Sequence, residues 1–122
     1  ALPICLTEAL VEAGVTYKRS SGYWNNCICC GTSGVLLHFV EAGKLLNDAK
    51  YRNIADEIAD KLLNDAYKDA DGKRWYDAWT RLKPWDVEAH IGLYVGTAGN
   101  ASSLLTYYAD RANKEITPIF EY

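Results

Sequence analysis

The chain has 122 residues, of which 49% are hydrophobic and 24% charged, and its formal net charge is −3. This length and composition predict one small globular domain, and the acidic balance without a Lys/Arg cluster argues against nucleic acid as a partner. No apolar run approaches the roughly 20 residues that a membrane span needs, and no signal peptide is visible. We therefore expect a cytoplasmic protein.

Four helices are expected from the spacing of apolar residues. The second is apolar nearly all round, which predicts burial on most sides, whereas the third has one apolar and one acidic face and should be half solvated. The expected ranges are about 3–14, from Thr32 or Ser33 to about Asn47, about 49–67, and about Ala98 to Asn113.

Three connecting segments show no clear period. Residues 15–30 should form a long loop, and a loop of that length in a small domain is usually functional. Residues 69–92 are rich in turn and aromatic residues and predict an ordered loop with at most a short strand or a turn of helix. Residues 116–120 should be extended around Pro118.

The four cysteines are Cys5, Cys27, Cys29 and Cys30, and the last three lie within four residues. Disulfide-stapled domains spread their cysteines along the chain, whereas clustered thiols more often bind metal or carry out chemistry. We favour metal binding over inert buried thiols and over redox chemistry.

A glycine pattern occurs twice, as Gly31-Thr32-Ser33-Gly34 and, 65 positions later, as Gly96-Thr97-Ala98-Gly99. Each copy precedes an apolar helix, which is typical of an array of helical hairpins; the alternative is two chance helix starts. The second copy has Tyr94 and Val95 where the first has adjacent thiols. The repeat itself therefore predicts a structural scaffold, and the adjacent thiols are a feature of the first copy alone.

The stretch Cys29-Cys30-Gly31-Thr32-Ser33-Gly34 resembles the zinc-binding Cys-His-Gly-x-x-Gly signature of the lanthionine synthetase C-like proteins. Gly92–Gly99 and the tail ending Pro118-Ile119-Phe120-Glu121 are similar to the final repeat of that family. The resemblance runs from about residue 5 to the end. It implies an all-α fold made of the C-terminal helical hairpins of an α/α toroid, an incomplete ring. Residues 1–122 would then be a single partial domain of a longer protein, with repeats starting near Gly31 and Gly96.

The same resemblance implies that Cys29 and Cys30 are two zinc ligands, with Cys30 at the position where a histidine is usual. The third ligand of the family comes from a Trp-Cys-x-Gly stretch that is absent here, and we expect it upstream of Ala1. No catalytic residue is transferred to this chain. For Cys27 we favour a buried apolar thiol, and the alternative is a substitute ligand.

Other candidates have simpler interpretations. His38, inside the second helix, is expected to be packed and hydrogen-bonded rather than a proton donor, and His90 to face a loop or an interface rather than to act in catalysis. Trp75, Trp79 and Trp85 could line a peptide-binding rim, but aromatic packing under a loop is favoured.

The resemblance implies part of a zinc-dependent cyclase. Such an enzyme adds peptide cysteine thiolates to dehydroalanine or dehydrobutyrine and forms lanthionine or methyllanthionine thioethers, so its partner is a dehydrated precursor peptide. We expect this chain alone to be inactive, and its exposed apolar edge could pair with another copy. The alternative function is a non-catalytic helical-repeat interaction module with structural thiols. A different α/α toroid lacks support, because no Asp-rich or paired-carboxylate motif is present.

Overall fold

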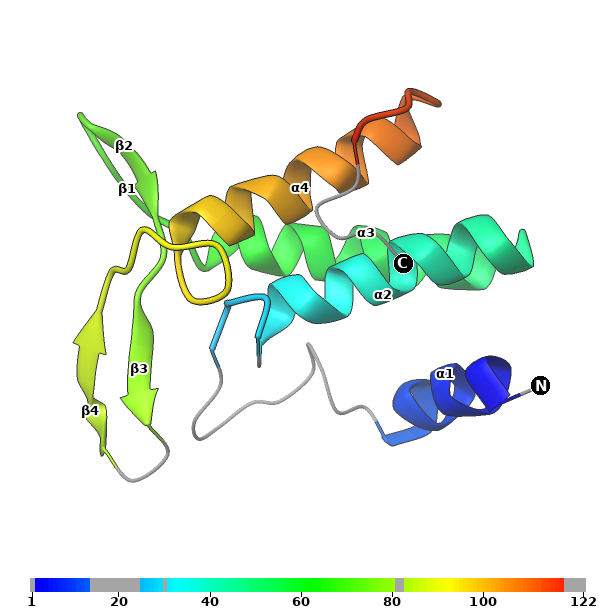
Figure 1. Cartoon of the computed structure of the whole chain (residues 1–122), viewed down its shortest axis with the longest axis horizontal. Helices are drawn as coiled ribbons and strands as arrows, with labels where there is room; N and C mark the ends of the chain where they lie inside the picture. The colour runs from blue at the N-terminus through cyan, green and yellow to red at the C-terminus, as the bar shows by residue number, and fades with distance from the viewer. Residues whose placement is uncertain (1, 14–24, 30, 81–82, 118–122) are drawn as a thin grey trace.

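The computed structural model describes residues 2–13, 25–29, 31–80 and 83–117, and four helices and two small β-hairpins lie within them (Figure 1). The elements in chain order are α1 (Leu2–Ala13), α2 (Thr32–Leu46), α3 (Ala49–Asn64), β1 (Tyr67–Asp69), β2 (Gly72–Arg74), β3 (Asp77–Thr80), β4 (Lys83–Glu88) and α4 (Thr97–Arg111). The predicted all-α fold is confirmed in its helical character, since the described chain is mostly helical, and the two hairpins are an addition to it.

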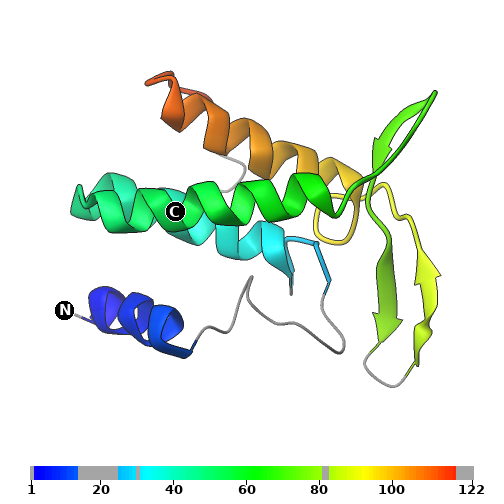
Figure 2. The ribbon, with the colours of Figure 1, turned by 180° about the vertical axis from the view of Figure 1, so that it is seen from behind.

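Helices α2, α3 and α4 pack against one another and enclose the core. The hairpins lie at the end of this group where α2 and α4 begin and α3 ends, as Figures 1 and 2 show from opposite sides. The core residues come mainly from the three helices: Leu36, Phe39, Val40, Ala42, Tyr51, Ile54, Ala55, Ile58, Ala59, Leu62, Trp75, Leu104 and Tyr107. Among the described residues, no helix is both long and apolar enough to cross a membrane.

Helix α3 has the two faces that its sequence predicts. Ile58 and Leu62 are fully buried on the apolar face, while Glu57 and Asp60 are exposed on the other. The helix begins after Asp48, whose Oδ1 accepts a hydrogen bond from Lys50 N at 2.9 Å and so caps the first turn. It ends at Asn64, earlier than the sequence indicates, because the chain turns into β1.

Helix α2 is buried along one side only. Leu36, Phe39 and Val40 are buried, but Leu45 is 75% exposed at the last turn. The helix stops at Asn47, which adopts the left-handed conformation common at helix ends. The described residues therefore bury only part of the apolar surface of α2, although its sequence predicts burial on most sides.

The two hairpins replace the ordered loop predicted for residues 69–92. In the first, Asp69 pairs with Gly72 across a tight turn, and Gly72 has a φ of 124° that favours glycine. In the second, Asp77 pairs with Glu88 and Thr80 with Lys83, with an irregularity between Ala78 and Thr80. Strands β1, β2 and β3 show no apolar alternation, and in β4 the alternation is limited to Trp85 and Val87, so strands are hard to predict from these sequences.

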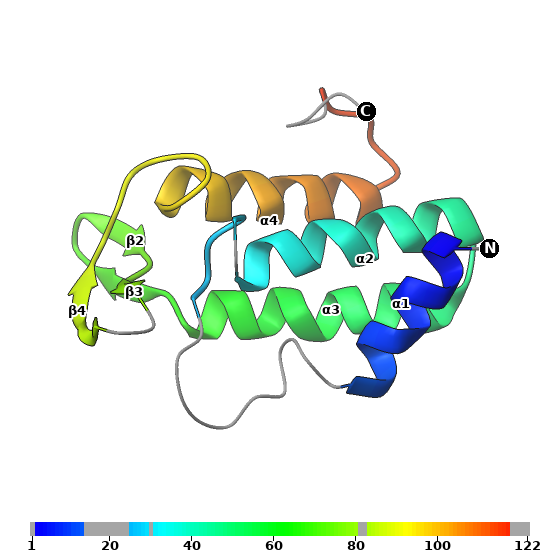
Figure 3. The ribbon, with the colours of Figure 1, turned by 60° about the horizontal axis from the view of Figure 1, so that its bottom comes forward.

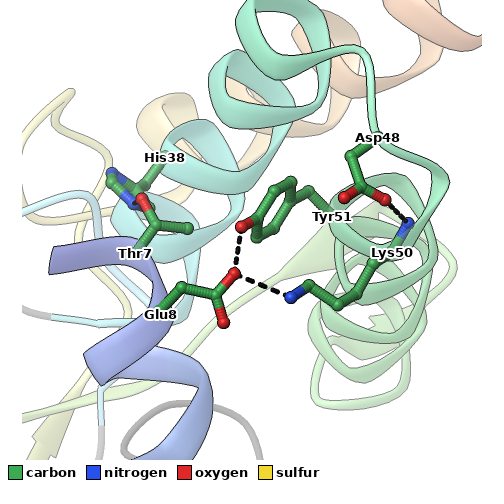
Figure 4. Close-up of polar contacts among 6 residues, drawn as sticks. All are labelled: Thr7, Glu8, His38, Asp48, Lys50 and Tyr51. Carbon is green, nitrogen blue, oxygen red and sulfur yellow. Dashed lines mark hydrogen bonds and ion pairs between the residues drawn. The ribbon is translucent and has the colours of Figure 1, made fainter. Parts of the chain in front are cut away.

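Helix α1 lies across α2 and the start of α3 (Figure 3), and polar contacts hold it there (Figure 4). The Glu8 carboxylate accepts hydrogen bonds from Tyr51 Oη and, at 2.7 Å, from Lys50 Nζ. Thr7 Oγ1 lies within hydrogen-bonding distance of His38 Nε2, at 3.0 Å. Leu10 and Val11 also pack on the core, so α1 is docked by both kinds of contact.

Candidate functional site

The loop that precedes α2 folds back onto the first turn of the helix. Thr32 N donates to Asn25 O, and Ser33 N donates to Asn26 O, both at 3.0 Å. The N-cap residue Gly31 has no side chain to cap the helix, so these loop carbonyls satisfy N–H groups that a helix start otherwise leaves unpaired. The loop and the helix start therefore form one rigid unit.

Gly31 and Gly34 are required by this close approach. A Cβ at Gly31 would collide with the backbone of Asn25, and a Cβ at Gly34 would collide with Ile28 O. The two glycines therefore allow the loop carrying the cysteines to lie directly on the helix.

The loop before α4 has a similar construction, with several of the same contacts 65 positions later. Thr97 N donates to His90 O at 2.8 Å, as Thr32 N does to Asn25 O. A Cβ at Gly96 would meet His90 O, and one at Gly99 would meet Leu93 O. Matched hydrogen bonds at matched positions show that the second glycine pattern serves the same local purpose as the first.

The two loops also contact each other. Cys29 N donates to Tyr94 O at 3.1 Å. A Cβ at Gly99 would lie 3.0 Å from Ile28 Cδ1, so the first loop packs on the start of α4. One turn further, Ser33 Oγ donates to Asn100 Oδ1 at 2.6 Å between buried side chains. The starts of α2 and α4 are thus joined at three points.

The cysteines differ in their surroundings. Cys29 is exposed in the loop before α2, Cys27 is fully buried, and Cys5 is exposed on α1. Cys30, the second predicted ligand, lies outside the described residues. Within the part of the chain that the structure describes, no three His, Cys, Asp or Glu side chains are grouped so that they could hold a metal ion. Of the two predicted ligands, the structure therefore places only Cys29, accessible and next to the second loop.

The two histidines differ in their surroundings. His38 is close to Thr7 of α1 and stacks edge-on against Phe39, and the removal of water from its ring lowers its pKa. His90 Nε2 lies 3.7 Å from a carboxylate oxygen of Glu88, and the His90 carbonyl accepts from the start of α4. His38 makes the contacts expected of a packed histidine, but the residue is exposed rather than buried.

The tryptophans are divided between the core and the surface. Trp75 is buried, and its Nε1–H donates to Leu62 O at 2.7 Å, which is the aromatic packing expected for it. Trp85 is 76% exposed on β4. The side chain of Trp79 is not among those that the structure describes.

Asp77 is a buried residue of this region that the sequence analysis missed. Its side chain is only 1% exposed, and its Oδ1 accepts from Asn26 N at 2.7 Å. Burial raises the pKa of Asp77, while the hydrogen bond from Asn26 and the nearby His90 act in the opposite direction. A carboxylate within the aromatic sequence Trp75-Tyr76-Asp77-Ala78-Trp79 is the one signal that could have drawn attention to it.

The fold and the site define a helical protein in which two glycine loops pack together and one of them presents a thiol. The sequence model of the family described as lanthionine synthetase C-like protein matches residues 5–121, which is nearly the whole chain. The chain belongs to the lanthionine synthetase C-like family, which is generally zinc-binding and acts on peptides. No curated protein and no solved structure matches it.

Proposed function

We propose that this chain forms part of a zinc-dependent cyclase that makes lanthionine or methyllanthionine thioethers, and that Cys29 and Cys30 are two of its zinc ligands. The observation that carries the proposal is the exposed Cys29 in a loop that is hydrogen-bonded directly to the start of α2, within a chain of this family. A well-ordered loop favours a metal site, because ligands that are already in place lose less freedom when the metal binds.

The donor chemistry fits zinc in part. Thiolates are preferred zinc ligands, and a site with three protein ligands keeps its fourth position open for a substrate. Cys29 and Cys30 supply two thiols, and the described residues hold no complete group of three ligands. The proposal therefore requires a third ligand from outside the described part of the chain. Cys27 is less suited to this task, because it is fully buried.

When bound, zinc would hold the peptide thiol as a thiolate near neutral pH. The overall reaction forms a bond between a cysteine sulfur and the β-carbon of dehydroalanine or dehydrobutyrine, and the α-carbon takes up a proton. The chain's own contribution is positional. The Tyr94 carbonyl and the start of α2 fix the backbone around Cys29, and the exposure of Cys29 leaves room for a peptide. We propose no proton donor among the described residues.

The proposal includes a dehydrated precursor peptide as substrate and the cytoplasm as location, since thiols stay reduced there. We also propose that 1–122 is a partial domain built of repeats starting near Gly31 and Gly96. The matched hydrogen bonds of the two loops support this division. Exposed apolar residues at 91–95 would suit pairing with further repeats or with another copy.

The second candidate is a non-catalytic interaction module with structural thiols. The complete burial of Cys27 favours it, because buried thiols commonly act as small apolar groups. In that case Cys29 would have no metal to bind, and the exposed apolar loop would be the functional surface.

Metal content separates the two candidates. The full-length protein, including the segment before Ala1 in which the third ligand is expected, is purified without oxygen and titrated with zinc against a chromophoric chelator. The cyclase proposal predicts about one equivalent of zinc, lost in Cys29→Ser and in Cys30→Ser. Cys5→Ser is the matched control, since Cys5 is also an exposed thiol but lies on α1. A wild-type chain without zinc, or variants that bind it unchanged, would support the interaction module instead.

A further inference from the structure

Asp77 connects the second hairpin to the loop that carries Cys29. It is the first residue of β3, and its buried Oδ1 accepts from the backbone N–H of Asn26, 51 residues earlier in the chain. Asn26 lies three residues before Cys29. The Asp77 side chain of β3 thus binds the backbone of the loop before α2, close to the predicted ligand Cys29.

The position of Asp77 is itself fixed by its neighbours. Trp75, two residues earlier, is buried and donates through Nε1 to Leu62 O at the end of α3. Trp75 N also lies 3.5 Å from Thr97 Oγ1 at the start of α4. On the other strand, Glu88 pairs with Asp77 in register. The backbone that carries Asp77 is therefore held by α3 and α4 through Trp75 and by β4 through strand pairing.

The loop is held at both ends of the segment that contains Cys27 and Ile28. Asn26 N–H is bound by Asp77 at one end, and Cys29 N–H is bound by Tyr94 O at the other. Asn26 also uses its carbonyl to accept from Ser33 N of α2. Both backbone groups of Asn26 are thus engaged, one by the hairpin and one by the helix.

A buried carboxylate is an expensive way to bind one N–H group. Placing a charge in the interior costs free energy unless hydrogen bonds compensate it. Asp77 Oδ2 and Asn26 Oδ1 are buried and have no hydrogen-bond partner within the described residues. Within the described part of the chain, only Oδ1 of Asp77 accepts a hydrogen bond, from Asn26 N. The structural contribution of Asp77 is therefore this one acceptor.

We propose that Asp77 is a positioning residue, whose carboxylate holds the loop at Asn26 so that the Cys29 thiol is presented in one conformation to its metal. The ordering of the loop is supported by the hydrogen bonds of Asn26 to Asp77 and of Cys29 to Tyr94. The consequence for a metal rests on the proposed function.

The test compares Asp77→Ala, Asp77→Asn and wild type in the full chain by amide hydrogen exchange. The alanine variant has no acceptor, so exchange in peptides covering 25–31 should rise by about tenfold or more. The asparagine variant keeps a neutral acceptor and should show a smaller rise. Asp86→Ala is the matched control, because Asp86 is exposed on the paired strand β4. Peptides from α3 should exchange as in wild type in all variants.

A loop whose exchange is unchanged in Asp77→Ala overturns the inference, as does an equal rise in α3. Should Asp77→Ala fail to fold, Asp77→Asn decides, and exchange at 25–31 equal to wild type overturns the inference.

Cobalt(II) added to the same proteins reports on the metal. The thiolate-to-cobalt absorption of wild type should be kept in Asp77→Asn and weakened or shifted in Asp77→Ala. Bands identical in all three proteins overturn the role of Asp77 toward the metal. A wild-type protein without such bands contradicts the proposed zinc site, and the exchange data then still decide whether Asp77 orders the loop.

Discussion

Ser33 and Asn100, one in the first turn of α2 and the other in the first turn of α4, form a buried hydrogen bond of 2.6 Å between Oγ and Oδ1. Both side chains are completely buried, and the pair joins the two helix starts beneath the loops. Removing one partner would leave a buried polar atom unsatisfied, which costs more than the hydrogen bond alone.

We expect Ser33→Ala and Asn100→Ala each to lower the free energy of unfolding by about 1–3 kcal/mol. In a double-mutant cycle the two losses should be strongly non-additive, because the residues share one interaction. Urea denaturation measures both quantities. Ser102→Ala, on the same helix as Asn100 but outside this contact, should leave the stability nearly unchanged. Additive losses would show that the two residues act separately.

Gly34 and Gly43 offer a comparison within one helix. A Cβ at Gly34 would collide with the backbone of Ile28, whereas a Cβ at Gly43 would meet the flexible Cγ of Arg52 at 2.9 Å. We expect Gly34→Ala to destabilise the chain by at least about 2 kcal/mol and to displace the cysteine loop. Gly43→Ala should destabilise the chain less, because a side-chain carbon of Arg52 can move more easily than the Ile28 backbone and because alanine favours helix. Thermal denaturation tests the order, and equal melting temperatures for the two variants would contradict it.

Tyr107 links α4 to α3. Its Oη donates to Asp56 Oδ1 at 2.6 Å, and burial together with this bond raises the pKa of Tyr107 to about 12. The folded state thus keeps the phenol proton more tightly than the unfolded state does. Tyr107 should therefore add stability below about pH 10 that is lost as the pH rises from about 10 toward 12. Measured across this range, the difference in unfolding free energy between wild type and Tyr107→Phe should shrink; a constant difference would contradict the assignment.

Glu8 holds α1 on the start of α3. Hydrogen bonds from Lys50 and Tyr51 lower the pKa of Glu8 below its ordinary value. Because the folded state favours the ionised carboxylate, its contribution is present above about pH 4.5 and is lost as the pH falls through the lowered pKa. Glu8→Gln should increase proteolysis of α1 at neutral pH, whereas Glu12→Gln, at an exposed position of the same helix, should not. Identical cleavage rates for the two variants would argue against the contact.

Much of the helical framework can be predicted from the sequence. The apolar period of 49–67 places Ile54, Ile58 and Leu62 on one face, and the structure buries all three. The glycine patterns likewise mark the starts of α2 and α4, because only glycine fits where loop carbonyls lie against a helix. The spacing of apolar residues and the positions of glycines can both be recognised directly in a sequence.

The hairpins and Asp77 could not be predicted in the same way. The strand Tyr67–Asp69 is mostly exposed and shows no apolar alternation that would mark it as a strand. Asp77 acquires its role from a backbone N–H 51 residues away, and a single aspartate carries no motif. Such long-range contacts depend on how Trp75 anchors the hairpin, which becomes visible only in the folded chain.

X-ray absorption at the zinc edge tests the central proposal most directly. With the full chain loaded with one equivalent of zinc, we predict a shell of at least two sulfur ligands at about 2.3 Å, which loses sulfur in Cys29→Ser and in Cys30→Ser but not in Cys5→Ser. A shell of nitrogen and oxygen alone, or a sulfur shell that both loop variants leave unchanged, would contradict the assignment of Cys29 and Cys30 as zinc ligands.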